Sequence, residues 1–460
     1  MSSETAHARG SWSGKWAFIL AAAASAIGLG NLWRFPYLAA KYGGGAFLLT
    51  YIVLVVTFGF TLMLLEVAIG RKTGQSALGA FKSFGKKYAF IGMFTSAIPF
   101  IIVPYYCVIG GWVVKYASAY LTDGPHALAD GGDYFSAFIA SGTESFIPMF
   151  VFLAVVFVIV AFGVKRGIER VNRVLMPLLI VMAIGISIYV LTMPGALDGL
   201  AYYLTPDFSK FSPELVIAAM GQMFYSLSLA MGIMITFGSY MRKEDNLEQS
   251  VRRTEIFDTG IALLCGLMIV PAAFVAMGSA DAVAAKSGPS LMFIVLPTVF
   301  ENMGGAATLM GFLFFLLVVF AALTSAISLT ETCVSIVMDS AHLSRRRSFA
   351  LCVAVITICA VFVNMGYSQL AFIEPLGPGT TILDFLDFIS NSVMMPLSAL
   401  MACVFVGWIV KPKVVSDEVR SSGPFKSEKL FNVMVKFIAP VFVVVILVAY
   451  VAQQFGFFSM

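Results

Sequence analysis

One stretch near the start of the chain decides the fold: residues 24–36 read Ala-Ser-Ala-Ile-Gly-Leu-Gly-Asn-Leu-Trp-Arg-Phe-Pro. Small and polar residues occupy the middle of an apolar run, where a membrane helix usually has Leu, Ile or Val. An interrupted helix inside a membrane is tolerated only where its freed backbone groups line a cavity or bind something. A second apolar run carries the comparable segment Phe-Tyr-Ser-Leu-Ser-Leu-Ala-Met-Gly at 224–232. The alternative is that the small residues only allow helices to pack closely. This accounts for one such segment, but it accounts less well for two in the same chain.

The composition around these segments is that of a membrane protein. Of 460 residues, 60% are hydrophobic and only 12% are charged, whereas about a quarter of a soluble protein is charged, which excludes a water-soluble enzyme. Apolar runs long enough to cross about 30 Å of hydrocarbon predict an all-α membrane protein with eleven transmembrane helices. The expected spans are 14–38, 44–70, 88–121, 146–164, 168–192, 212–240, 255–279, 306–339, 347–366, 382–410 and 431–456.

The positions of Lys and Arg predict the orientation of these spans. With residues 1–13 as a cytoplasmic N-terminal segment, 24 of the 29 Lys and Arg residues fall in cytoplasmic segments, as short cytoplasmic loops require. Eleven spans then place the C-terminus outside. A polar N-terminus followed by many spans also argues against a cleaved signal peptide. We therefore expect a multi-pass protein of the inner (plasma) membrane.

The two interrupted spans are the first and the sixth, five spans apart. Because five is odd, a second unit that begins at the sixth span runs inverted relative to the first, as in many secondary transporters. The sequence thus predicts a 5+5 inverted repeat with broken helices 1 and 6. Its units are residues 14–192 and 212–410, and residues 431–456 form an eleventh helix outside both.

Cysteine and histidine usage argues against redox or metal catalysis. The six Cys lie in apolar runs without CxxC spacing, and the three His are far apart, so no haem, iron–sulfur or zinc site is indicated. No nucleophile and base converge either, and we expect no organic cofactor, no enzyme activity and no nucleic-acid partner. Ionisable residues inside the spans are costly and are usually functional or paired. They are Arg34, Glu66, Asp258, Glu331, Asp339, Asp384 and Asp387.

Several motifs occur in a characteristic order. They are Gly-Leu-Gly-Asn-Leu-Trp-Arg-Phe-Pro at 28–36, Gly-Gly-Gly-Ala-Phe at 43–47, Tyr-Tyr at 105–106, Gly-Ile-Glu-Arg at 167–170, Gly-Gln-Met-Phe-Tyr-Ser-Leu-Ser at 221–228 and Phe-Ala-Ala-Leu-Thr-Ser at 320–325. Together they closely resemble the neurotransmitter:sodium symporter family with its leucine-transporter fold, from Arg9 to the last span. The resemblance implies a bacterial-type symporter that uses sodium to import an amino acid across the lipid bilayer by alternating access.

The resemblance implies two sodium sites. The first would use Ala26, Asn31, Ser226 and Asp258; the second would use carbonyls of Ala24, Ile27 and Ala321 with the hydroxyls of Thr324 and Ser325. All of these groups offer oxygen, the donor that a hard cation prefers. The alternative for the two hydroxyls is a bond to their own helix's carbonyls. In chloride-dependent relatives a neutral residue occupies the Asp258 region, so this carboxylate could replace the anion, with Tyr51 and Gln222 as neighbours.

The substrate site implied by the resemblance lies on helices 1, 3, 6 and 8. Its residues would be Ser25, Ala26, Leu29, Gly30, Ile102, Tyr106, Tyr225, Ser226, Ser228, Met231, Ser325 and Leu329. Relatives that carry monoamines have Asp where this chain has Gly28, so the substrate should bring its own carboxylate. The apolar lining predicts a hydrophobic L-amino acid. Aromatic side chains remain open, because Ser25 and Ala230 differ from some relatives and Ala230 narrows the pocket.

Gates are implied on both sides of the substrate site. Outside, Arg34 would face Asp387, with Asp384 adding to the field and with Tyr106 and Tyr225 as an aromatic lid; a static ion pair is the structural alternative. Inside, the gate would consist of Arg9, Asp339, Trp12 and Tyr240. Two other functions remain open. Glu66, Asp258 and Glu331 could support a proton-coupled permease, and a non-transporting sensor could share the fold. The oligomeric state is also open.

Overall fold

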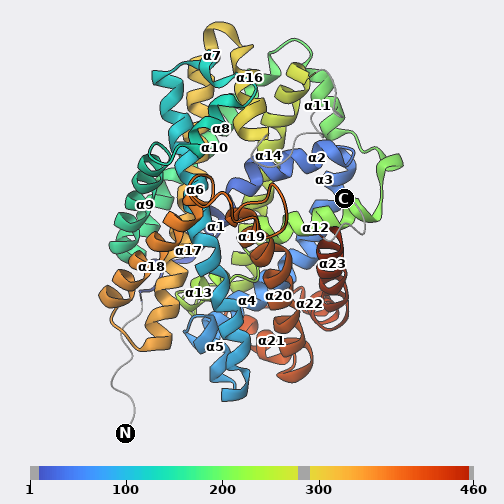
Figure 1. Cartoon of the computed structure of the whole chain (residues 1–460). Coiled ribbons are helices and arrows are strands. Elements are labelled where there is room, and N and C mark those ends of the chain that lie inside the picture. The colour runs from blue at the N-terminus through green and yellow to red at the C-terminus, as the bar shows by residue number, and fades with distance from the viewer. Residues whose placement is uncertain (1–9, 278–290, 455–460) are drawn as a thin grey trace.

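The computed structural model describes residues 10–277 and 291–454, and in these ranges the regular structure is helical (Figure 1). Eight helices are long and apolar enough to cross a membrane. They are Gly45–Thr73 (α3, Gly45–Leu54; η2; and α4, Phe60–Thr73), Lys86–Thr122 (mainly α6, Ala89–Thr122), Val164–Leu191 (η4 and α10, Glu169–Leu191), Leu247–Met277 (α14), Gly304–Ala341 (mainly α17, Ala307–Ala341), Arg345–Met365 (α18), Ile382–Ile409 (α19, Ile382–Asp387; η8; α20, Met395–Val404; and η9) and Glu428–Gln454 (α22, Glu428–Val433; η10; and α23, Ala439–Gln454). A ninth candidate is a bent pair, Lys15–Ala26 (α1) and Gly30–Lys41 (η1 and α2), whose halves differ in direction by 55°.

The other expected spans correspond to shorter helices. The fourth is Phe146–Ala161 (α9), and the sixth consists of Pro213–Ser226 (α12) and Ile233–Ser239 (α13). The seventh helix begins at Leu247, whereas the sequence predicted a start at 255. Its first two turns are polar, and hydropathy does not detect them. Short helices between the spans escaped sequence analysis because they lack a membrane-length apolar run. They are Ala77–Ser83 (α5), Pro125–Leu128 (α7), Asp133–Ala140 (α8), Ala196–Leu204 (α11), Leu296–Glu301 (α16) and Lys413–Arg420 (α21).

The first interruption lies between α1 and η1. α1 ends at Ala26, and Ile27 adopts an extended conformation with ψ 94°. The next residues include Gly28 and Gly30, which lack a side chain and allow other groups to approach the backbone closely. The carbonyl of Gly30 accepts a hydrogen bond from Gln222 Nε2 of α12 at 3.1 Å. The first broken helix is thus tied to the second at its interruption.

The second interruption extends over residues 227–232. Ser228 and Ala230 have φ values of 52° and 62°, a left-handed conformation that costs an L-residue about 1–2 kcal/mol. Glu66 of α4 stabilises the segment, because its Oε1 accepts the backbone N–H of Ala230 at 2.6 Å. This buried carboxylate satisfies a backbone group that the broken helix leaves without a helical partner. Glu66 therefore has a structural role that its position in the sequence did not reveal.

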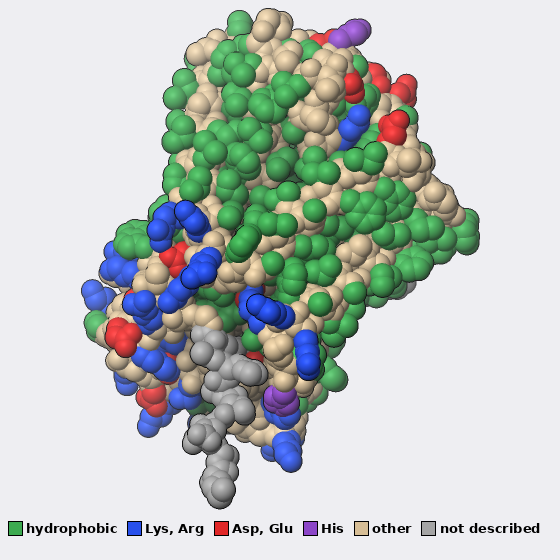
Figure 2. Space-filling model, turned by 90° about the vertical axis from the view of Figure 1, so that its left-hand side faces the viewer, with side chains coloured by type: hydrophobic (Ala, Val, Ile, Leu, Met, Phe, Trp, Pro, Cys, Tyr) green, Lys and Arg blue, Asp and Glu red, His purple; other side chains and the backbone are tan. Residues whose placement is uncertain are grey.

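α1 lies near the centre of the molecule and packs against α14 and α17 (Figure 1). α6 reaches the first interruption through Tyr106, whose Oη accepts the backbone N–H of Leu29. The outer helices expose large apolar side chains such as Val181 of α10 and Val448 of α23. One face of the molecule shows this apolar surface over its upper and middle parts, with Lys and Arg gathered on its lower part (Figure 2). This arrangement places the interruptions in the protein interior, away from the apolar outer surface.

Candidate functional site

A small central cavity of about 30 Å³ lies where the two broken helices meet α6 and α17. It is lined by Ser25, Ala26, Gly28, Gly30, Ile102, Tyr106, Tyr225, Ser228, Met231, Ile233, Ser325 and Leu329. Ten of the twelve residues expected in the substrate site are among them. Leu29 and Ser226 are not, although the Leu29 N–H donates to Tyr106 Oη at 3.3 Å. Sequence analysis missed Gly28 and Ile233 as lining residues, and the only signal for Ile233 was its position directly after the interruption.

Two glycines allow neighbouring side chains to approach the backbone closely at the wall of the central cavity. A Cβ atom on Gly28 would lie 2.7 Å from Ser325 Oγ and 2.9 Å from Tyr106 Oη. A Cβ atom on Gly30 would lie 2.4 Å from a ring carbon of Tyr225. Neither position accepts a side chain without displacement of its neighbours. The cavity therefore lacks a carboxylate at Gly28, and its exposed chemistry is that of backbone groups, hydroxyls and apolar side chains.

A first group of oxygen atoms surrounds Asp258 beside the cavity. The Asp258 carboxylate accepts hydrogen bonds from Ser226 Oγ at 2.9 and 3.0 Å, from Asn31 Nδ2 at 2.9 Å and from Tyr51 Oη at 3.4 Å. All four side chains are buried. Ser226 Oγ also lies 3.4 Å from Asn31 Oδ1. Carboxylate, amide and hydroxyl oxygens thus converge, as a hard cation requires. The expected neighbour Gln222 instead donates to Gly30, and its Oε1 has no hydrogen-bond partner among the described residues.

A second group of oxygen atoms joins α17 to the interruption of helix 1. Ser325 Oγ donates to the carbonyl of Ser25 at 3.0 Å and lies 3.4 Å from that of Ile27. Its hydroxyl thus reaches across to another helix. Thr324 Oγ1 instead donates to the carbonyl of Ala321 in its own helix at 3.0 Å. The bond to its own helix, which was the alternative for this Thr-Ser pair, is therefore found for Thr324, and the sodium site at the two hydroxyls stays a prediction.

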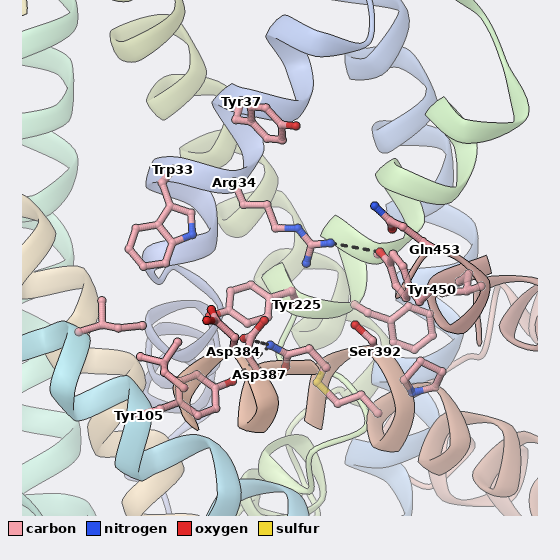
Figure 3. Close-up of a pocket in the computed structure, with 18 residues that line it drawn as sticks. Trp33, Arg34, Tyr37, Tyr105, Tyr225, Asp384, Asp387, Ser392, Tyr450 and Gln453 are labelled. Carbon is pink, nitrogen blue, oxygen red and sulfur yellow. Dashed lines mark hydrogen bonds between the residues drawn. The ribbon is translucent and has the colours of Figure 1, made fainter. Parts of the chain in front are cut away.

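A larger cavity of about 480 Å³ lies beyond Tyr225 and contains the expected outer gate (Figure 3). Arg34 and Asp387 both line this cavity, but among the described residues no ion pair joins them. Arg34 Nη2 instead donates to Tyr450 Oη at 3.1 Å, and Asp387 accepts a hydrogen bond from Asn391 at 2.6 Å. Asp384 caps the start of α19 by accepting the backbone N–H of Thr381 at 2.8 Å. The gate residues face one cavity without closing it.

Comparison with known proteins identifies the family. The family model described as the sodium:neurotransmitter symporter family matches residues 9–127 and 136–457. The chain belongs to this family. It is 32% identical to an uncharacterised sodium-dependent transporter of Bacillus subtilis over 95% of this chain and 96% of that one. It is 27% identical to the sodium-dependent serotonin transporter of Drosophila melanogaster over 97% of this chain and 77% of that one.

A solved structure supports the same family. The crystal structure of MhsT in complex with L-phenylalanine matches with a TM-score of 0.85 at 36% sequence identity, covering 96% of this chain and 100% of that one. Family membership confirms the expectation of a membrane transporter that is not an enzyme. The family name and the names of its relatives also establish sodium as the coupling ion of the family.

A second closely packed region surrounds Trp12, which lies just before α1. The Trp12 side chain is fully buried, its Nε1 donates to the carbonyl of Phe237 at 3.0 Å, and its ring packs edge-on against Phe237 and Tyr240. Tyr240 Oη donates to Glu331 Oε1 at 2.9 Å, and Arg345 forms an ion pair with the same carboxylate at 2.5 Å. The Tyr240 hydroxyl is thus bonded to a carboxylate that forms an ion pair with Arg345. The sequence did not predict this pair of Glu331 and Arg345.

Asp339, the other expected member of this inner gate, accepts hydrogen bonds from the backbone and hydroxyl of Ser76 at 2.7 and 2.5 Å. These bonds tie the end of α17 to the start of α5. Arg9, which we expected to pair with Asp339, lies outside the described residues. The pairing therefore stays a prediction.

Proposed function

We propose that this family member is a sodium-coupled symporter that imports a hydrophobic L-amino acid by alternating access. The observation that carries the proposal is the central cavity, which lies between the two helix interruptions and beside both groups of oxygen atoms. A cavity beside two groups of oxygen atoms lets an organic substrate and cations bind next to one another, as coupled transport requires.

The chemistry of the cavity favours an amino acid with an apolar side chain. The walls at Gly28 leave no room for a protein carboxylate, so the ligand itself supplies the negative charge. The interruption of helix 1 offers backbone N–H groups, which favour an anion. Ile102, Met231, Ile233 and Leu329 provide an apolar lining for the side chain. The 36% identity to MhsT, whose structure was determined with L-phenylalanine, supports the same substrate class.

We assign one co-transported sodium ion to each group of oxygen atoms. The first would contact Ala26, Asn31, Ser226 and the substrate carboxylate, with Asp258 as ligand or compensating charge. The second would lie among the carbonyls of Ala24, Ile27 and Ala321 and the hydroxyls of Thr324 and Ser325. Each ion would link helix 1 to another helix, since Ser226 belongs to helix 6 and Ser325 to helix 8. Binding would thereby favour conformations in which these helices are close.

The proposed topology is eleven spans with the N-terminus in the cytoplasm. It counts the bent α1 and α2 pair, α9 and the interrupted α12 and α13 pair as spans together with the eight long helices. Residues 14–192 and 212–410 are the inverted repeats. The Lys and Arg side chains on the lower part of Figure 2 support a cytoplasmic location of that end. The large cavity then opens to the outside, and the Trp12 cluster closes the cytoplasmic side.

Uptake into proteoliposomes tests the proposal directly. Purified protein should accumulate labelled L-leucine or L-phenylalanine when an inward sodium gradient is imposed, and potassium in place of sodium should abolish the accumulation. A pH gradient without sodium is the control for proton coupling. Binding of the amino acid without any sodium-driven accumulation would favour a sensor, and accumulation driven by the pH gradient alone would refute sodium coupling.

A further inference from the structure

The hydroxyl of Tyr450 provides the hydrogen bond that holds Arg34 in the large cavity. Tyr450 belongs to α23, the eleventh span, which lies outside both proposed repeats. Its Oη accepts a hydrogen bond from Arg34 Nη2 at 3.1 Å, which Figure 3 shows as a dashed line between the two side chains, both of which line the cavity. No other hydrogen bond of the Arg34 side chain occurs within the described ranges. A charged guanidinium with five donors thus relies on a neutral hydroxyl.

The backbone of α12 leaves room for the Tyr450 hydroxyl at Gly221. A Cβ atom on Gly221 would lie 1.5 Å from Tyr450 Oη and 2.7 Å from the adjoining ring carbon. Gly221 precedes the interruption of helix 6 and opens the motif at 221–228, yet it forms no part of the central cavity. Its missing side chain therefore serves the close approach of Tyr450. Two elements far apart in sequence are fitted to each other to place one hydroxyl beside Arg34.

We propose that Tyr450 is a positioning residue that holds Arg34 away from Asp387 and thereby stabilises the open state of the large cavity. Asp387 lines the same cavity and already accepts a hydrogen bond from Asn391, so both gate residues have substitute partners in this conformation. In the proposed closed state, Arg34 exchanges its hydrogen bond to Tyr450 for an ion pair with Asp387. Because a ligand or contact made in one state only shifts the equilibrium toward that state, the hydroxyl opposes closure. The eleventh span thus sets the resting position of the gate.

A cysteine placed at Ser392, which lines the large cavity, reports the open state. The six native cysteines give a low background because five are buried and Cys359 is only partly exposed. Reaction with a membrane-impermeant thiol reagent is measured in the parent and in Tyr450→Phe, which removes only the hydroxyl. A hydrogen bond to a charged group is worth about 1.5–3 kcal/mol, so the open population relative to the closed one should fall about tenfold or more.

Tyr37→Phe is the matched control. Tyr37 lines the same cavity, but its hydroxyl accepts a hydrogen bond from Lys41 at 3.2 Å instead of contacting Arg34. We expect slower labelling in Tyr450→Phe, parental labelling in Tyr37→Phe and recovery in Tyr450→Phe combined with Asp387→Asn. Gly221→Ala should act like Tyr450→Phe. Parental labelling in Tyr450→Phe, or slow labelling that survives Asp387→Asn, would overturn the proposal.

The inference rests on the proposed function only in taking the large cavity to face outside and to close during transport. Failure of sodium-driven uptake by the parent protein would refute the proposed function. The difference in labelling between Tyr450→Phe and Tyr37→Phe would still decide the role of the hydroxyl, because it requires no transport.

Discussion

Replacing Asp258 with Asn removes one negative charge from the first group of oxygen atoms and nearly preserves its shape. The carboxylate accepts hydrogen bonds from Asn31, Ser226 and Tyr51 and is completely buried. It is therefore the fixed charge of the proposed first sodium site. We expect Asp258→Asn to weaken sodium binding strongly and to reduce sodium-driven uptake.

The structure sets the size of this effect. Oxygen ligands hold Ca²⁺, an ion of similar radius, at about 2.3–2.6 Å. The Asp258 carboxylate lies 2.9 Å from Ser226 Oγ, so an ion bound to that hydroxyl lies within about 5.5 Å of the charge. At an effective dielectric constant of about 20, two unit charges at that distance interact by about 3 kcal/mol. This energy corresponds to a loss of sodium affinity of about 100-fold.

Sodium titration of amino-acid uptake in chloride-free proteoliposomes, together with direct binding of radioactive sodium, measures the effect. Glu248→Gln is the matched control, since Glu248 is another buried carboxylate of α14 but accepts the backbone N–H groups of Lys426 and Ser427, far from Ser226 and Asn31. It should leave the sodium midpoint nearly unchanged. In Asp258→Asn, chloride should restore part of the uptake if an anion can take over the charge. An unchanged sodium midpoint in chloride-free medium would refute the charge-balance reasoning.

Three further predictions concern the gate, the second sodium site and the strained segment of helix 6. Arg34→Ala should bind substrate yet fail to translocate it, because the closed state loses its cation; a parental exchange rate in proteoliposomes would show that the residue is only structural. Replacing both Thr324 and Ser325 with Ala should weaken sodium binding and make a cysteine near Trp12 more reactive from the cytoplasmic side; sodium that still suppresses this reactivity would contradict the assignment. Ala230→Gly should raise stability by up to about 1 kcal/mol, because φ at this position is 62°, and a lower melting temperature in a thermal unfolding assay would argue against backbone strain.

The sequence alone determined the helical class and the positions of most long apolar helices, and its small and polar segments coincide with the breaks after α1 and after α12. The hydrocarbon core of the membrane imposes these features locally. Each backbone N–H and C=O needs a hydrogen-bond partner within its own helix, and only an apolar run of about 20 residues is long enough to cross. The family resemblance named ten of the residues that line the central cavity, and six of these ten lie within the two segments 24–36 and 224–232, where the small and polar residues mark the cavity directly in the sequence. Helix limits were less certain at polar ends, as Leu247 shows.

Only the tertiary structure decided which partner each polar side chain finds. Tyr450 meets Arg34 although the two are 416 positions apart, Glu66 accepts the backbone N–H of Ala230, and Glu331 pairs with Arg345. Hydropathy places a residue at a depth in the membrane, but its direction around the helix and the identity of its neighbours depend on how the helices rotate and cross. Those quantities are set by side-chain packing throughout the bundle, which no single span of sequence contains.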